Sequence, residues 1–180
     1  MEIFNMKRKL FKSRALRAHV DDEFTAIVPA PFGAVGIQVQ DGVLQGLTCL
    51  PPQTPKKLPA DPVSKKAAQQ VKKYFSQPDF HFDLPMAVSG TDFQRRVWDE
   101  IAAIPAGETA TYGELARRLN TAPRAVGQAC ANNRLALAIP CHRVVGAKGV
   151  GGFFGVAEGA GSHTRTKRWL LQHEGCKLNP

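Results

Sequence analysis

The sequence predicts a mixed α/β (α+β) protein, with a small antiparallel sheet and one helix followed by a mainly helical half. The strongest observation is a pair of β-rich runs, Ala34–Gln40 and Val43–Leu50, on either side of Asp41-Gly42. That dipeptide is typical of a two-residue hairpin turn with positive φ at both positions. The second observation is helical spacing of apolar residues from Lys65 onward. With 180 residues, the chain can form one larger domain or two small ones.

The first half is predicted to contain no catalytic constellation. Phe24–Val28 is predicted as a strand that ends before Pro29, and Pro51–Pro62 as a connection rich in proline and lysine. Ser64 is the expected N-cap of a helix over Lys65–Phe75, whose apolar face carries Ala68, Val71 and Phe75. This half is therefore a sheet with one covering helix.

The boundary between two domains is placed at Gly90. Phe82–Ser89 is predicted to be an extended linker, which divides the chain into 1–89 and 90–180. Thr91 or Asp92 can cap the next helix. Its apolar residues recur at helical spacing: Phe93, Val97, Ile101 and Ile104.

Two short helices in the second half form a helix-turn-helix pattern. Thr111 is the expected cap of Tyr112–Leu119, and Pro123 opens a second helix over Arg124–Ala131. In a basic protein this pattern favours DNA binding, although ordinary helical hairpins share it. The second helix has a face of small residues, which suits either close approach to a narrow groove or close packing on a neighbouring helix. Both interpretations stay open at this point.

The charge of the chain points to an anionic partner. The formal net charge is +9 and the pI is about 9.7. Nucleic acid is the leading candidate, and a solvated basic surface is the alternative. Part of the charge lies in Met1–Val20, which is predicted to be a flexible basic arm or an extended start. That stretch lacks the apolar core and cleavage site of a secretory signal, and no apolar run is long enough to span a bilayer.

The four cysteines indicate reduced thiols in a cytoplasmic protein without a membrane partner. The cysteines are scattered along the chain, at Cys49, Cys130, Cys141 and Cys176. They include no CxxC pair and no Cys/His spacing suited to zinc. Neither a metal nor a cofactor is therefore expected.

Cys141 is the candidate nucleophile. It lies in the apolar stretch Ile139–Val145, next to His142 and Arg143, whose positive charge is expected to hold the thiol at a depressed pKa. The alternative is a small hydrophobic core residue, as most buried cysteines are. The glycines between Gly149 and Gly155 form a loop whose backbone can approach a planar ligand closely, and a last helix is predicted near Thr166–His173.

The motifs of the second half, taken in order, resemble the O6-alkylguanine-DNA alkyltransferase family. They are Gly90-Thr91-Asp92-Phe93-Gln94, Ile104-Pro105-Ala106-Gly107, Thr111-Tyr112-Gly113-Glu114-Leu115-Ala116, Arg124-Ala125-Val126-Gly127, Asn133, Ile139-Pro140-Cys141-His142-Arg143-Val144-Val145 and Trp169-Leu170-Leu171-Gln172-His173-Glu174. The resemblance implies a ribonuclease H-like N-terminal domain and a winged-helix-like C-terminal domain. It also implies transfer of an alkyl group from DNA to a cysteine.

The resemblance assigns roles residue by residue. Cys141 matches the acceptor cysteine, His142 its imidazole partner acting through a water, and Glu174 the carboxylate that orients the imidazole. The hinge asparagine and the tyrosine that bonds the flipped base match Asn133 and Tyr112. The family's DNA-binding residues match Arg124, Ala125, Gly127 and Ala129, of which Arg124 replaces the extruded base in the duplex. The family's pocket residues match Pro140, Val144, Phe154 and Gly155. The backbone carbonyls of Cys141 and Val144 are expected to hold the guanine amine.

The implied activity is irreversible, single-turnover repair of O6-alkylguanine, and less so of O4-alkylthymine, in double-stranded DNA. The base is flipped out through the minor groove, and the protein is a monomer in solution, with cooperative assembly on DNA left open. Two features depart from the family: Phe154 stands where a tyrosine is usual, and Val156–Arg165 is longer, which could enlarge or cover the pocket mouth. Two alternatives remain, a non-enzymatic sensor of alkyl lesions, which Cys141 argues against, and a thiol hydrolase of a small substrate.

Overall fold

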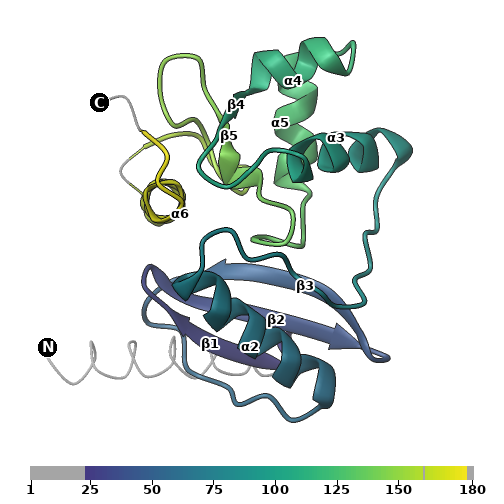
Figure 1. The fold of residues 1–180 in the computed structure, drawn as a ribbon, viewed down its shortest axis with the longest axis vertical. Coiled ribbons are helices and arrows are strands. Elements are labelled where there is room, and N and C mark those ends of the chain that lie inside the picture. Colours follow the sequence, from purple (N-terminus) through teal and green to yellow (C-terminus); the bar gives the residue numbers. More distant parts are fainter. Residues whose placement is uncertain (1–22, 160, 178–180) are drawn as a thin grey trace, which may run out of the picture.

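The two halves of the molecule are stacked on one another (Figure 1). The computed structural model describes residues 23–159 and 161–177. The lower half holds one antiparallel sheet in the order β1-β2-β3, covered by helix α2: β1 (Ala26–Ala30), β2 (Gly33–Gln40), β3 (Val43–Leu50) and α2 (Pro62–Ser76). The upper half holds the helices α3 (Asp92–Ala102), α4 (Tyr112–Arg118), α5 (Pro123–Ala131) and α6 (Ser162–His173). The basic arm predicted over 1–20 lies outside the described residues.

The predicted hairpin is confirmed, and the strand before it lies two residues later than expected, at Ala26–Ala30 instead of Phe24–Val28. Asp41 and Gly42 have φ values of 52° and 74°, so the turn joins β2 and β3 at the predicted place. β1 runs on through Pro29, which pairs with Ala34, instead of ending before the proline. A proline is tolerated there because β1 is an edge strand with no ladder hydrogen bond required on its outer side.

Helix α2 begins earlier than predicted, and its N-cap is Asp61, not Ser64. The Asp61 carboxylate accepts a hydrogen bond from the backbone N–H of Ser64 at 2.8 Å, and Pro62 occupies the first helical position. Ser64 is fully buried on the face that packs on the sheet. The cap was misassigned because proline at the first helical position moves the cap one residue upstream of it.

The segment predicted as a linker is held against the sheet. Leu44 of β3 donates its N–H to the Pro85 carbonyl and accepts from the N–H of Ala87, each at 2.9 Å. The Gln70 side chain of α2 bonds both backbone groups of Asp83, at 2.8 and 2.9 Å. The chain between the halves is thus extended, as expected, but it is fixed along the edge of the sheet.

The segment 135–139, which precedes the Cys141 motif, is mostly buried and mostly irregular. Leu135 makes a single bridge with Leu47 of β3, and Leu137 has a φ of 71°. The Leu47 N–H donates to the Arg134 carbonyl at 2.8 Å, and the Ala136 N–H donates back to Leu47 at 3.0 Å. These bonds join the two halves through backbone contacts near the middle of the molecule.

The first three helices of the second half begin as the sequence predicts, whereas α6 begins at Ser162, four residues before the predicted start at Thr166. Thr91 and Thr111 each form a capping box, with Gln94 and Glu114 respectively. Helices α4 and α5 pack together as a helix-turn-helix, and α5 also packs on α3, where the Trp98 indole donates to the Ala129 carbonyl at 2.9 Å.

A short parallel pair of strands completes the upper half. β4 (Ala110–Thr111) pairs with β5 (Val144–Val145), which directly follows the single 3-10 turn η1 (Cys141–Arg143). Because Thr111 is also the cap of α4, Tyr112 begins its helix beside the strand that follows Cys141.

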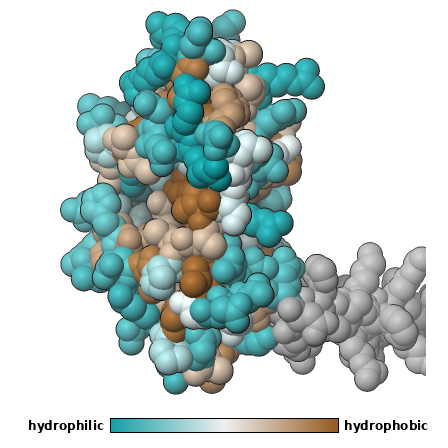
Figure 2. Space-filling model, turned by 90° about the vertical axis from the view of Figure 1, so that its right-hand side faces the viewer, coloured by the Kyte–Doolittle hydropathy of each residue, from teal (hydrophilic) through white to brown (hydrophobic). Residues whose placement is uncertain are grey.

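Apolar side chains gather at mid-height on the face shown in Figure 2, where the two halves meet, and hydrophilic side chains dominate above and below them. One continuous core cluster includes β2 and β3 residues of the lower half together with α3, α5 and Cys141 of the upper half. No helix within the described ranges is long and apolar enough to cross a membrane.

The Asp61 cap allows a test of the corrected helix start. Asp61→Ala should lower the free energy of unfolding by about 1 kcal/mol, because the Ser64 N–H loses its acceptor. Asp79→Ala, at an exposed position just beyond α2, is the matched control and should change stability by less than about 0.5 kcal/mol. Urea unfolding measures both values; equal effects would contradict the assigned cap.

Candidate active site

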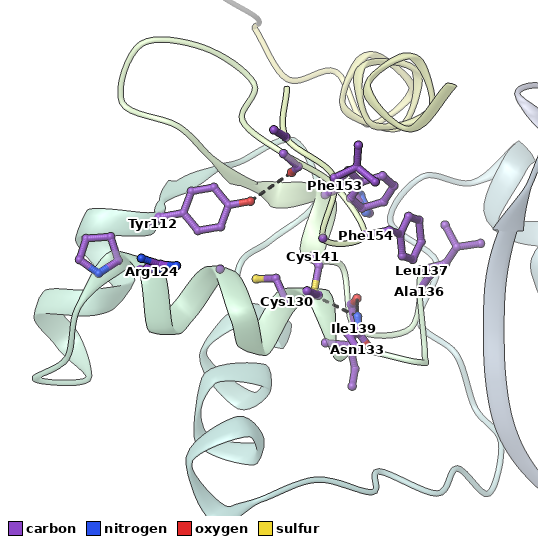
Figure 3. Close-up of a pocket in the computed structure, with 18 residues that line it drawn as sticks. Tyr112, Arg124, Cys130, Asn133, Ala136, Leu137, Ile139, Cys141, Phe153 and Phe154 are labelled. Atoms are coloured by element: carbon purple, nitrogen blue, oxygen red, sulfur yellow. Dashed lines mark hydrogen bonds between the residues drawn. The ribbon is translucent and has the colours of Figure 1, made fainter. Parts of the chain in front are cut away.

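A cavity of about 690 Å³ opens between the helix-turn-helix and the glycine-rich loop. Figure 3 shows Tyr112, Arg124 and Cys130 on the helical side, with Cys141, Phe153 and Phe154 facing them. The cavity brings together eight of the residues predicted for the site: Tyr112, Arg124, Gly127, Asn133, Cys141, His142, Phe154 and Gly155. The helix face and the cysteine motif therefore belong to one pocket.

The Cys141 thiol lies at the inner wall of this cavity and is held by Asn133. The Asn133 amide donates to the Cys141 sulfur at 3.0 Å and to the Ile139 carbonyl at 2.8 Å, so both of its N–H groups are used. Its carbonyl accepts the Leu135 N–H at 2.9 Å. Asn133 therefore ties the end of α5 to the chain on both sides of Pro140 and aims one hydrogen bond at the sulfur.

The resting pKa of Cys141 differs from the prediction. A hydrogen bond with the Cys130 thiol and burial raise the pKa of Cys141 well above its ordinary value, against the opposing effects of Asn133 and Lys167. The expected lowering by His142 and Arg143 is absent because both side chains are turned toward Glu174 instead. The thiol is thus protonated at rest, and a base must remove its proton before it can act as a nucleophile.

Glu174 is the centre of a buried network behind Cys141. Its side chain is fully buried, and His142 Nε2 lies 2.9 Å from Oε1. Arg143 bonds both carboxylate oxygens, at 2.8 and 2.9 Å, and its remaining terminal nitrogen donates to the Ile104 carbonyl. Burial alone would raise the pKa of Glu174, but the hydrogen bonds from His142 and Arg143 outweigh it and lower the pKa to about 2. The carboxylate is therefore ionised at any physiological pH.

The fourth donor to this carboxylate comes from the other half of the molecule. Tyr74 of α2 is almost completely buried and its hydroxyl donates to Glu174 Oε1 at 2.8 Å. The sequence motifs do not indicate this contact, because Tyr74 occupies an ordinary core position of an amphipathic helix one hundred residues before its partner. Arg143 was likewise not predicted as a partner of Glu174.

The state of His142 follows from its surroundings. Burial lowers the pKa of His142 more than the neighbouring Glu174 raises it, so the neutral imidazole is favoured. With an ionised carboxylate at Nε2, that nitrogen carries the proton and Nδ1 keeps a free lone pair. His142 is therefore arranged as a base oriented by a carboxylate.

Tyr112 lies across the cavity from Cys141 as a hydrogen-bond donor. Its hydroxyl donates to the Gly152 carbonyl at 3.2 Å, and burial raises its pKa well above the ordinary value. The phenol thus stays protonated. In Figure 3 the ring projects from the start of α4 toward the glycine-rich loop.

Lys167 is a residue of the site that the sequence interpretation missed. Its side chain is completely buried, and Nζ donates to the Val144 carbonyl at 2.6 Å and the Gly152 carbonyl at 2.9 Å. Burial lowers the pKa of Lys167 to about 8. The signal was its spacing: Lys167 lies two helical turns before Glu174, on the buried side of α6. The Val144 carbonyl, expected to hold a guanine amine, is therefore already bonded to an ammonium group.

Four other predicted positions do not line the cavity. Ala129 is buried in the core beside Trp98, so close helix packing, one of the two interpretations of the small-residue face, holds at that position. Ala125 is half-buried, and Pro140 and Val144 are buried behind the Cys141 motif. The exposed residues of α5 are Pro123, Arg124, Gln128 and Ala131.

The loop that departs from the family pattern folds back to form the outer wall. Phe153 and Val156 exchange backbone hydrogen bonds at 2.9 and 3.0 Å, and Phe154 between them has a φ of 51°. The Glu158 carboxylate accepts from the Gly151 N–H at 2.8 Å and pairs with Arg168 of α6 at 3.5 Å. Val156 and Ala157 line the cavity, so this part of the longer segment forms part of its wall.

The donor set does not suggest a metal. In the described part of the chain, no group of three or more His, Cys, Asp or Glu side chains could hold an ion.

Comparison with known proteins identifies the group to which this architecture belongs. The family described as 6-O-methylguanine DNA methyltransferase, DNA binding domain, matches residues 92–176. The methylated-DNA–protein-cysteine methyltransferase of Methanosarcina mazei is 38% identical over 130 residues, covering 68% of this chain and 82% of that protein. The protein of the same name from Mycobacterium bovis is 35% identical over 153 residues, covering 82% and 89%.

Solved structures agree over nearly the whole chain. The O6-methylguanine methyltransferase of Mycobacterium tuberculosis superposes with a TM-score of 0.67 at 35% identity, covering 83% of this chain and 90% of that one. A structure of the M. tuberculosis protein in complex with DNA gives a TM-score of 0.66 at 36% identity, covering 83% and 91%. With relatives of this identity matched across both halves, the chain belongs to the methylated-DNA–protein-cysteine methyltransferase family.

Proposed function

We propose that this protein repairs O6-alkylguanine in double-stranded DNA by moving the alkyl group irreversibly to Cys141, with O4-alkylthymine as a poorer substrate. One observation carries the proposal: a buried thiol with an oriented base behind it lines a cavity whose opposite wall is the second helix of a helix-turn-helix. The family membership supports the same chemistry.

The transfer begins with removal of the thiol proton. A water between Cys141 and Nδ1 of His142 carries that proton to the imidazole, because adjacent residues do not point at each other. The resulting imidazolium is stabilised by the ionised Glu174. The Asn133 amide and the Lys167 charge favour the thiolate that remains.

The thiolate sulfur then attacks the alkyl carbon, and the bond from that carbon to guanine O6 breaks. Guanine is a poor leaving group as an anion, so a donor is needed to neutralise it. Tyr112 is protonated and projects into the same cavity, which suits it to that role. The product on Cys141 is a thioether, which offers water no electrophilic carbonyl, and each molecule therefore acts once.

The DNA must deliver the base to this cavity from outside the duplex. The target atom is inaccessible inside the base stack, so the nucleotide is flipped out through the minor groove at a cost of roughly a few kcal/mol. Arg124 is exposed at the first turn of α5, at the rim of the cavity, where its side chain can fill the vacated space. Gly127, one turn later, lets the backbone approach the DNA closely.

The rest of the proposal concerns organisation. The chain divides at 89/90 into two domains, acts as a monomer in the cytoplasm and needs no cofactor.

A lesion sensor of the same fold has no use for an activated thiol, and a thiol hydrolase has no use for Arg124 at the rim of the cavity. These two observations favour the acceptor function over both alternatives.

The acceptor assignment is tested by weighing the protein after reaction with duplex DNA that contains O6-methylguanine. The unmodified chain should gain the mass of one methyl group per molecule, on the peptide that contains Cys141. Cys141→Ala should bind the same DNA without any gain in mass, whereas Cys176→Ala, outside the cavity, should react like the unmodified chain. Methylation of Cys141→Ala would refute the assignment.

The contact between the halves predicts a positioning role for Tyr74. Tyr74→Phe removes one donor from Glu174 Oε1, which leaves more negative charge facing His142 and raises the pKa of His142. The neutral imidazole is the base, so the transfer rate falls as His142 becomes protonated at low pH. In Tyr74→Phe this low-pH limb of the rate profile should move to higher pH, by up to about one unit.

Phe82→Leu is the packing control for Tyr74→Phe, since the two ring centroids lie 6.3 Å apart. It should lower the Tm without moving the pH limb. Single-turnover rates between about pH 5 and pH 9 measure the limb for each variant. If the low-pH limb of the rate profile is not shifted in Tyr74→Phe, Tyr74 only packs in the core and does not position His142.

Base flipping predicts that Arg124 matters only for duplex substrates. Arg124→Ala should slow transfer from duplex DNA about tenfold or more, because the vacated space in the stack is no longer filled. The rate with the free O6-alkylguanine base should stay within about twofold. Arg117→Ala removes the same charge from an exposed position on α4 and should leave the ratio of the two rates unchanged. Equal slowing of both substrates by Arg124→Ala would contradict this role.

A further inference from the structure

A second thiol, which the transfer chemistry does not use, lies against the acceptor. Cys130 is in the last turn of α5 and lines the same cavity as Cys141, and its thiol is the first of the groups that raise the pKa of Cys141. In Figure 3, Cys130 projects from the end of α5 and Cys141 from the segment that faces it. The other two cysteines, Cys49 and Cys176, do not line it, and all four thiols are free.

We propose that Cys130 and Cys141 form a modification site in which a hydroperoxide converts the two thiols into a reversible disulfide. The acceptor is then neither available for alkyl transfer nor lost to further oxidation. This property is separate from alkyl transfer, since it requires neither DNA nor an alkylated base.

The chemistry balances with hydrogen peroxide as the oxidant. The Cys141 thiolate attacks one peroxide oxygen, the O–O bond breaks, and the products are the sulfenic acid of Cys141 and hydroxide. The Cys130 thiol then attacks the sulfenic sulfur; an S–S bond forms, the S–O bond breaks and water leaves with the Cys130 proton. In total, two thiols lose two electrons and two protons, and one peroxide becomes two water molecules.

The groups around Cys141 favour the first step. The Asn133 amide donates to its sulfur at 3.0 Å, and the Lys167 charge lies close enough to favour the thiolate. The cavity of about 690 Å³ admits a molecule as small as hydrogen peroxide although both sulfurs are largely shielded from bulk solvent. The sulfenic acid would therefore form where the Cys130 thiol is its immediate neighbour.

The backbone can accommodate the bond. A disulfide needs an S–S distance of about 2.05 Å, which is closer than two thiols in a hydrogen bond. Cys130 is one residue from the end of α5, and Cys141 begins a single 3-10 turn. The chain between them is mostly irregular, with Leu137 at a φ of 71°, so a small local movement does not have to break a long helix or strand.

Without Cys130, the same oxidation would end differently. A sulfenic acid with no neighbouring thiol reacts with a second peroxide to give a sulfinic acid, which ordinary thiols do not reduce. Under the proposed function each molecule uses Cys141 only once, so oxidation to the sulfinic acid would inactivate molecules that have not yet reacted with DNA. Capture by Cys130 keeps the oxidised acceptor recoverable.

The test treats the full reduced chain with hydrogen peroxide, without DNA, and measures intact mass and free thiols. The chain should lose the mass of two hydrogen atoms and two of its four free thiols, and dithiothreitol should restore both. Trypsin cleaves after Arg124, Arg134 and Arg143, so Cys130 and Cys141 fall in different peptides that should be recovered as one linked pair. This mapping needs no variant.

Two variants separate the proposal from general oxidation. Cys130→Ser should gain the mass of two oxygen atoms on the Cys141 peptide, and dithiothreitol should not reverse the gain. Cys49→Ser, which removes a thiol outside the cavity, should behave like the unmodified chain. Oxygen added to Cys141 of the unmodified chain while Cys130 stays free would overturn the proposal, as would a disulfide that involves Cys49 or Cys176. Neither result would bear on alkyl transfer, which the methyl adduct tests separately.

Discussion

The structure of the site depends on one buried carboxylate. Glu174 has no exposed side-chain surface, and an isolated charge there would be very costly. Four hydrogen bonds satisfy it, from His142, Tyr74 and twice from Arg143. These bonds explain why Arg143, next to the nucleophile, does not act on it, and why His142 keeps Nδ1 free. They also join the last helix, the cysteine motif and the N-terminal half in a single network.

The glycine-rich loop of the pocket is held by a second buried charge. Lys167 bonds the carbonyls of Val144 and Gly152, and Gly152 is also the acceptor for Tyr112. One ammonium group therefore positions β5, the glycine-rich loop and, through Gly152, the tyrosine. Two residues of α6 and its C-cap support the pocket from behind: Lys167 supports the loop and Glu174 supports the base. This arrangement explains why a helix far along the chain is needed for a site centred on Cys141.

The elements that the sequence predicted well are those with local signals. The Asp41-Gly42 turn needs two residues with positive φ, and the capping boxes at Thr91 and Thr111 need a partner three residues away. The predicted start of α2 is wrong because Pro62 occupies the first helical position and Asp61 caps the helix, whereas Ser64 lies within it. The irregular backbone of segment 135–139 is bonded to β3, and no local pattern encodes these contacts.

By itself, the sequence determined the family and the helix-turn-helix and indicated Cys141 as the candidate acceptor, because these depend on the order and spacing of short motifs. Only the tertiary structure decided the electrostatics of the site. It turned Arg143 and His142 away from Cys141, placed Lys167 on the Val144 carbonyl, and brought Tyr74 and Cys130 to partners that no motif connects to them. The reason is physical: a pKa and a hydrogen bond depend on distance and burial, and these are properties of the packed chain.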